Sequence, residues 1–207
     1  MLRVTDVVKN LIIINVVIYL VTMLVMPQVR DMLIFHYPGS SRGFQPFQII
    51  THMFMHAPNG GSLMSMHLLF NMVTLYFFGP PLEALWGGKR FLFFYFFAGL
   101  GAIALYAFVN FIEINYYGGS PTSALGASGA IFGVMTGFAY YYPNQKISLL
   151  FPPVSLPSKY FVPIIAVVEL SLGLGRVATG VAHFAHLGGA LFGLILILYW
   201  QKFGSRL

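Results

Sequence analysis

The sequence predicts an all-α integral membrane protein, and three observations support this. The 207 residues are 58% hydrophobic and only 8% charged, whereas soluble domains carry roughly 25% charged residues. The mean hydropathy is +0.80. Six mostly apolar runs also follow one another along the chain, each near the length of about 20 residues that crosses a bilayer as a helix. We therefore expect a six-helix membrane bundle formed by a single domain, residues 1–207.

The expected spans differ in how regular they are. The first resembles a signal peptide, but no A-x-A cleavage site follows it, so we expect it to be retained. Pro163 and the Gly173-Leu174-Gly175 end are expected to break the fifth span. The aromatic run at 91–97 is expected to face lipid or the interface. The six spans lie at roughly residues 10–26, 62–82, 91–112, 124–142, 160–175 and 181–200.

The distribution of Lys and Arg predicts the orientation of the spans. Cytoplasmic loops carry an excess of these residues. If both termini are placed in the cytoplasm, most Lys and Arg residues lie on the cytoplasmic side, so we expect this orientation. The connection 27–61 is then external and is expected to lie on the membrane surface. The inner set is Arg3, Lys9, Lys89, Arg90, Lys146, Lys159, Lys202 and Arg206, and the outer set is Arg30, Arg42 and Arg176.

Composition also excludes several functional classes. The chain has no cysteine, which excludes a disulfide framework, thiol catalysis and iron–sulfur ligation. The net charge of +6 comes without a basic run that has interleaved aromatic residues. We therefore read this charge as basic flanks of membrane spans and expect no nucleic-acid partner.

Polar side chains inside spans are costly, so each is a candidate functional residue. Ser128 stands in LGASGAIFG near the outer end of the fourth span, about one turn or 6 Å deep at 1.5 Å per residue. His67 in the second span and His186 in the sixth are expected at a similar depth. Asn71 shares a helix face with His67, because four residues separate them. Three spans are thus expected to bring polar groups to one level.

The polar groups expected at this depth include a serine and a histidine, which together can form a nucleophile and its base. A serine hydroxyl attacks only when a base takes its proton, and His186 is the expected base, with His183 the less favoured alternative. No aspartate lies in any span, so we expect no acidic third member, and the direction of Glu169 is left open. The unpaired N–H groups at the start of the fourth span are candidate donors to an oxyanion, together with His67 and Asn71.

Small residues predict where helices come close. Gly126 and Gly129 leave space beside Ser128. Small faces of this kind bring membrane helices into near contact, so the fourth and sixth spans are expected to pack against each other. The faces consist of Gly129, Gly133 and Gly137 on the fourth span and Gly189 and Gly193 on the sixth.

Taken together, five motifs form a recognisable pattern. They are H-x-x-x-H at His52 and His56, H-L-L-F-N from His67 to Asn71, Glu83-x-x-x-Gly87, G-A-S-G at 126–129 and A-H-L-G-G-A-L-F-G at 185–193. In this order the chain resembles the rhomboid family of intramembrane serine proteases over nearly its whole length. The resemblance implies a six-helix rhomboid-like fold, cleavage of transmembrane protein substrates, and no metal or cofactor.

The resemblance also implies roles for individual residues. By position, Ser128 is the nucleophile and His186 the general base, while His67, Asn71 and the Ser128 N–H form the oxyanion hole. Many family members carry a tyrosine where this chain has Phe132. The hydrogen bond of that tyrosine hydroxyl is lost here, so we expect the orientation of His186 to be less constrained.

The resemblance assigns loops as well. Residues 160–175 and 174–182 are expected to form a lateral gate and its cap, and 27–61 a half-embedded loop. The histidines of that loop are expected to hold backbone, and Glu83 to cap a turn. The loop histidines are His36, His52 and His56.

Two alternative functions remain open from the sequence alone. One is a catalytically silent rhomboid-like protein that binds membrane clients, and the other is a small channel or transporter. Silent relatives usually lose the serine or the histidine, and transporters place polar groups near the midplane, so the protease is favoured. The resemblance implies a multi-pass protein of the bacterial inner membrane. The natural substrate and the oligomeric state are left open.

Overall fold

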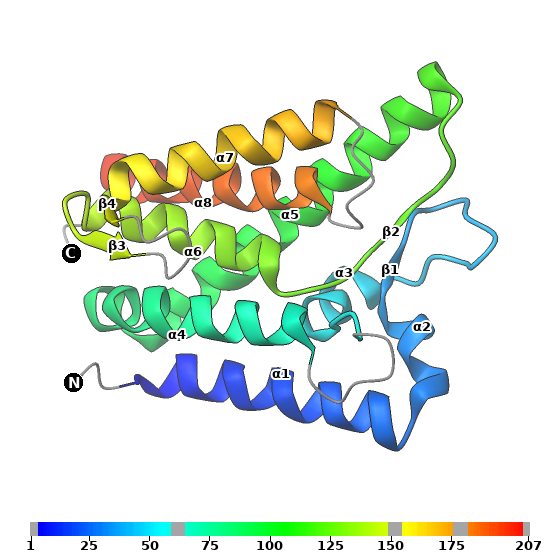
Figure 1. Ribbon diagram of the computed structural model, residues 1–207, viewed down its shortest axis with the longest axis horizontal. Coiled ribbons are helices and arrows are strands. Elements are labelled where there is room, and N and C mark those ends of the chain that lie inside the picture. The colour runs from blue at the N-terminus through cyan, green and yellow to red at the C-terminus, as the bar shows by residue number, and fades with distance from the viewer. Residues whose placement is uncertain (1–3, 59–64, 149–154, 176–181, 205–207) are drawn as a thin grey trace.

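A computed structural model describes residues 4–58, 65–148, 155–175 and 182–204 of the chain. Helices dominate it. The helices α1, α4, α6, α7 and α8 run along the long axis of the molecule, and α5 slants across them (Figure 1). The bounds of the main helices are α1 Asp6–Leu24, α4 Met66–Trp86, α5 Gly88–Tyr117, α6 Ser128–Tyr141, α7 Ser158–Leu174 and α8 His183–Phe203.

Four helices in the described part of the chain are long and apolar enough to cross a membrane, namely α1, α4, α5 and α8. The protein is thus a mostly helical, multi-pass membrane protein. Helix α6 has 14 residues and α7 has 17, fewer than the about 20 of a full crossing. Six spans and the cytoplasmic placement of the termini therefore stay predictions. Many large apolar side chains are exposed on the bundle, including Val17, Phe70, Phe77, Phe93, Phe108, Val167 and Leu198.

The connection between α1 and α4 is built from short elements. It contains η1 (Pro27–Val29), α2 (Arg30–Leu33), β1 (Phe35–His36), α3 (Gln48–Thr51) and η2 (His52–Phe54). Two short antiparallel ladders were not expected in an all-α protein: β1 pairs with β2 (Ser123–Ala124), and β3 (Lys146–Ser148) pairs with β4 (Ser155–Pro157).

Two expectations about helix limits are wrong. Helix α7 continues through Pro163 without a break. This proline is the sixth residue of the helix, so its missing N–H costs one hydrogen bond near the helix start. Helix α6 begins at Ser128, whereas we expected a span from residue 124. Residues 123 and 124 instead form β2, because they bond to β1 of the preceding loop.

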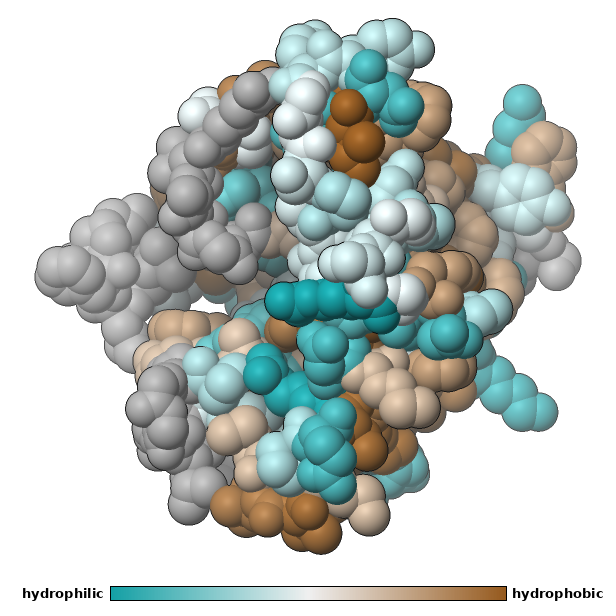
Figure 2. Space-filling model, turned by 90° about the vertical axis from the view of Figure 1, so that its right-hand side faces the viewer, coloured by the Kyte–Doolittle hydropathy of each residue, from teal (hydrophilic) through white to brown (hydrophobic). Residues whose placement is uncertain are grey.

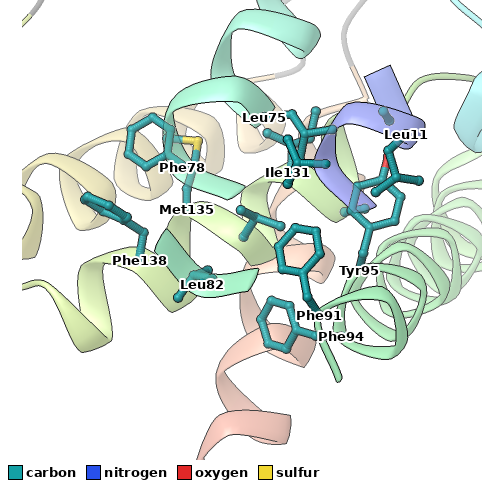
Figure 3. Close-up of a cluster of buried hydrophobic side chains, with 14 of the residues drawn as sticks. Leu11, Leu75, Phe78, Leu82, Phe91, Phe94, Tyr95, Ile131, Met135 and Phe138 are labelled. Carbon is teal, nitrogen blue, oxygen red and sulfur yellow. The ribbon is translucent and has the colours of Figure 1, made fainter. Parts of the chain in front are cut away.

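The core lies where α1, α4, α5 and α6 meet (Figure 3). Leu75 and Leu82 of α4 are fully buried there, as are aromatic side chains of α5. The prediction that the run 91–97 faces lipid is wrong for part of that run. Phe91, Phe94 and Tyr95 are fully buried while Phe93 is exposed, because a spacing of three or four residues directs side chains to the same helix face.

Glu83 caps the start of α1 rather than a turn. It is 7% exposed, and its carboxylate accepts hydrogen bonds from the Val7 N–H at 3.0 Å, the Val8 N–H at 2.9 Å and the Thr5 hydroxyl. The first N–H groups of a helix have no helical partner, and a carboxylate also suits the positive end of the helix dipole. One side chain of α4 therefore anchors the beginning of α1.

Replacing Glu83 by leucine should destabilise the protein by about 3 kcal/mol, because buried N–H donors of α1 lose charged acceptors. Chemical denaturation in detergent measures this change. Asp6→Asn is the matched control on the same helix turn, since the ion pair of Asp6 with Lys9 is exposed and exposed pairs contribute under about 1 kcal/mol. Equal losses in both variants would contradict the capping role.

Candidate active site

Three helices begin at the same end of the bundle, and each carries a candidate residue in its first turn. Helices α4, α6 and α8 start on one side of the molecule (Figure 1), with His67, Ser128 and His186 near their N-termini. Figure 2 looks onto this end, where hydrophilic side chains gather. Ser128 does not lie one helical turn inside a span as expected, since it is the first residue of α6. The preceding non-helical segment carries the chain to this position.

Ser128 and His186 form a hydrogen-bonded pair. The Ser128 hydroxyl lies 2.8 Å from Nε2 of His186, and the His186 side chain is 11% exposed. The ring of Phe132 stacks on the imidazole, with centroids 4.3 Å apart and planes 8° from parallel. Phe132 is one turn after Ser128, on the same face of α6. One face of α6 thus supplies both the hydroxyl and the surface that supports the histidine ring.

The glycine faces bring the two helices together as expected. A Cβ at Gly189 of α8 would lie 1.8 Å from the Gly129 carbonyl oxygen of α6, and a Cβ at Gly193 would lie 2.9 Å from the Gly133 Cα. No side chain fits there, so the backbones of α6 and α8 touch. Gly137 is different, because its nearest neighbours are Leu82 and Trp86 of α4, with Ile197 of α8 slightly farther away.

His67 presents an N–H toward the serine. The Ala57 N–H donates to its Nδ1 at 3.2 Å, so this nitrogen is the acceptor and the ring proton of the neutral form lies on Nε2. Ser65, the N-cap of α4, fixes Ala57 through a 2.6 Å bond to its carbonyl. A Cβ at Gly126 would lie 2.9 Å from His67 Nε2 and 3.5 Å from Ser128 Oγ. The donor and the nucleophile therefore border the same small space.

Gly126 is required at this point for two reasons. Its φ of +120° is a conformation that side-chain-bearing residues rarely adopt, and a Cβ would collide with the His67 ring. Asn71 is also buried, and its amide donates to the His67 carbonyl at 2.7 Å. An amide has a second N–H, so Asn71 retains one donor for a ligand.

A cavity of about 1030 Å³ opens beside the serine. The candidate residues from three helices line it, namely His67, Asn71, Ser128, Phe132 and His186, together with residues of α5 such as Tyr106 and Glu113. Within the described residues, no group of three or more His, Cys, Asp or Glu side chains is arranged to hold a metal ion. The cavity thus brings a hydroxyl, imidazole rings and an amide side chain together.

The structure places an acidic group beside His186, against our expectation of none. The Oε2 atom of Glu169 lies 2.6 Å from Nδ1 of His183, and its Oε1 atom lies 3.1 Å from Nδ1 of His186. Glu169 was visible in the sequence as the one acidic residue of the fifth apolar run, but helix direction alone could not aim it. His183 is turned toward Glu169, and the contact to Ser128 belongs to His186.

The loop histidines hold backbone and neighbouring side chains. His36 contacts the Ser123 hydroxyl and the Asp31 carbonyl, His52 bonds to the Gln48 carbonyl, and His56 bonds to the Asn15 amide. Burial lowers the pKa of His52 to about 4. Burial, with a smaller contribution from His67, lowers the pKa of His56 to about 3. Both rings are thus neutral near pH 7 and serve as hydrogen-bonding groups.

His52 also connects this loop to the site. Its carbonyl accepts the Gly126 N–H at 2.8 Å. The segment just before Ser128 is therefore held by the loop on one side and by the start of α6 on the other. Of the assigned gate and cap, residues 176–181 lie outside the described residues.

The fold and the site define a class: helical, multi-pass membrane proteins with a serine–histidine pair in a cavity at one end of the bundle. Comparison with protein families agrees with this class. The Rhomboid domain model matches residues 43–203. The chain belongs to the rhomboid family.

Curated relatives carry corresponding names. The chain is 33% identical to RHOMBOID-like protein 4 of Arabidopsis thaliana over 63% of its length, which covers 29% of that protein. It is 32% identical to Rhomboid protease GluP of Bacillus subtilis over 61% of its length and 22% of that protein. It is 32% identical to Rhomboid protease AarA of Providencia stuartii over 64% of its length and 50% of that protein. The chain thus spans half or less of these relatives.

Proposed function

We propose that this protein is an intramembrane serine endopeptidase that cleaves transmembrane segments of other proteins near the outer membrane face. One observation carries the proposal: the 2.8 Å contact between the Ser128 hydroxyl and His186 Nε2 within the cavity. Membership of the rhomboid family implies membrane proteins as substrates in general. Relatives named as rhomboid proteases support the reaction type.

The geometry is compatible with acyl transfer in two steps. His186 accepts the Ser128 proton while Oγ bonds to the scissile carbonyl carbon. The C–N bond then breaks, and His186 returns the proton to the leaving amine. Water attacks the resulting ester with His186 again as base, which releases the acid and restores the hydroxyl.

The oxyanion of each tetrahedral intermediate needs donors that are already in place. The Ser128 N–H at the start of α6, the Nε2–H of His67 and the second N–H of Asn71 are the proposed set. Helices α4 and α6 also direct the positive ends of their dipoles to this space, which favours a negative oxygen. The cavity, which polar residues such as Asn110 and Glu113 also line, gives water access to the site.

The same proposal covers the finer membrane assignment. A single domain of six spans, with both termini cytoplasmic, would put this end of the bundle at the outer face, and the bacterial inner membrane is the proposed location. The silent alternative is less well supported. A client-binding protein has no need of a hydroxyl aligned with an imidazole, and this chain keeps both residues in contact.

A fluorophosphonate tests the proposal directly. This reagent phosphonylates a serine, with fluoride as the leaving group, when a neighbouring base activates the hydroxyl. We expect the protein in liposomes to cleave a model transmembrane substrate and to be modified at Ser128, as located by mass spectrometry of its peptides. Heat-denatured protein serves as the control and should remain unmodified. No modification of the folded protein would argue against a serine protease, and modification at a different residue would argue against Ser128 as the nucleophile.

A further inference from the structure

The imidazole of His186 has a stacking partner and a hydrogen-bond partner at Nε2, but its other nitrogen, Nδ1, has no well-aligned hydrogen bond. Phe132 fixes the ring plane, and Ser128 occupies Nε2. The Nδ1 atom is buried and has no hydrogen-bond partner of good geometry in the described part of the chain. Buried polar atoms without a partner are uncommon and often have a functional reason.

The atom that faces this nitrogen is a carboxylate oxygen. Glu169 Oε1 lies 3.1 Å from His186 Nδ1, within reach of a hydrogen bond but not aligned for one. The other carboxylate oxygen is 2.6 Å from Nδ1 of His183. The side chain of Glu169 is 14% exposed, so water has little access to the carboxylate. A carboxylate in such surroundings acts strongly on a neighbouring imidazole, because screening is weak.

The direction of Glu169 follows from α7. Val162 is buried, and Ile165 and Glu169 continue the same helix face at spacings of three and four residues. The exposed residues Ile164, Val167 and Val168 occupy the opposite side. Glu169 is therefore the one acidic group on the inner face of α7, beside the first turn of α8.

We propose that Glu169 is a positioning residue for His186, which turns the Ser128–His186 pair into a Ser–His–Glu arrangement whose acid comes from α7. This inference rests on the proposed protease function. The carboxylate favours the tautomer with hydrogen on Nδ1, so that Nε2 accepts the serine proton. It also stabilises the imidazolium that forms when Ser128 attacks. Stacking on Phe132 fixes the ring plane but not the tautomer, which is why an edge contact adds to it.

His183 has a separate part in this arrangement. Its 2.6 Å bond to Glu169 Oε2 fixes the rotation of the carboxylate and leaves Oε1 directed at His186. Helix α7 and the start of α8 are thereby tied together by the same carboxylate that adjoins the base. A purely structural role would use only the contact with His183, so the two roles can be separated by substitution.

The test compares variants in liposomes with a model transmembrane substrate and with fluorophosphonate. Glu169→Gln keeps the shape but removes the charge, and Glu169→Asp keeps the charge on a shorter chain. His183→Gln removes the imidazole that fixes the carboxylate but leaves Glu169 beside the base. Wild type and Ser128→Ala are measured in parallel, with thermal unfolding of every variant.

We expect Glu169→Gln to lower kcat by about 10- to 100-fold, at or below the lower limit of the roughly 10²- to 10⁴-fold that an acid–base group itself contributes, because Glu169 acts only through His186, and we expect KM to change less than about 3-fold. Its fluorophosphonate labelling rate should fall in parallel, and Glu169→Asp should recover part of kcat. His183→Gln should lower kcat less than Glu169→Gln does. The inference is overturned if Glu169→Gln keeps kcat within about 2-fold, or if both variants lose activity only in proportion to lost thermal stability. Cleavage by Ser128→Ala, or none by wild type, would instead overturn the proposed function.

Discussion

Replacing Ser128 by alanine should abolish cleavage of a transmembrane substrate while the protein stays folded. Without the hydroxyl no ester can form, and loss of a nucleophile typically lowers kcat by 10⁴-fold or more, on the order of what removing the whole catalytic set does. The structural cost is small, because the substitution removes one hydrogen bond to His186, worth about 1 kcal/mol. Substrate cleavage in liposomes, followed on gels over time, measures the loss.

A second serine provides the matched control. Ser171 is exposed on α7, and its hydroxyl bonds to the Val167 carbonyl of its own helix. Ser171→Ala should cleave at the wild-type rate within about 2-fold, since exposed substitutions away from special features change little. Residual cleavage by Ser128→Ala at more than about a thousandth of the wild-type rate would assign the nucleophile elsewhere.

The membrane class and most helices could be predicted from the sequence, because an apolar run of about 20 residues is typical of a transmembrane helix. The ends of helices could not. Helix α6 begins four residues later than expected, since residues 123 and 124 pair with Phe35 and His36. The partner strand is nearly 90 residues away in the chain, so no local pattern marks it. The burial of Phe91 and Phe94 likewise depends on which face of α5 meets the bundle.

In the candidate site too, some features could be predicted from local sequence and others depend on tertiary packing. Ser128, His186 and the glycine faces could be identified because each belongs to a short motif with its own chemical reason. Their contact depends on the α6–α8 interface, and it was expected from their similar depth, the glycine faces and the family resemblance together. Glu169 could be recognised as an acid in an apolar run, but no role could be assigned to it, because the rotation of α7 is set by packing near the N-terminal end of that helix, around Phe161 and Val162. The place of Glu169 beside His186 therefore follows only from the three-dimensional packing.

Placing valine at Gly189 should abolish activity without touching either proposed catalytic side chain. A Cβ at this position would lie 1.8 Å from the Gly129 carbonyl oxygen. The obstructing atom is backbone, so no rotamer change relieves the overlap, and α6 and α8 must separate. We expect a loss of at least about 3 kcal/mol in stability, at the upper end for overpacked sites. Cleavage should fall below detection, because Ser128 and His186 sit on the two helices that move apart.

The Leu191→Val variant is the control for introducing a valine into α8. Leu191 is 48% exposed on the same helix, so Leu191→Val should change stability by less than about 1 kcal/mol and keep wild-type cleavage. Wild-type cleavage by Gly189→Val would mean that the helices are not in contact at this level.

Alanine substitutions separate helix contact from general destabilisation. A Cβ at Gly193 would lie 2.9 Å from the Gly133 Cα, and one at Gly137 would meet the flexible Leu82 side chain at 3.1 Å. The loss of cleavage should therefore decrease in the order Gly189→Ala, Gly193→Ala, Gly137→Ala. If stability alone controlled activity, fluorophosphonate labelling of the folded fraction would be equal in all three. If helix separation controls it, labelling per folded molecule should fall most for Gly189→Ala, whose added methyl lies one turn from His186.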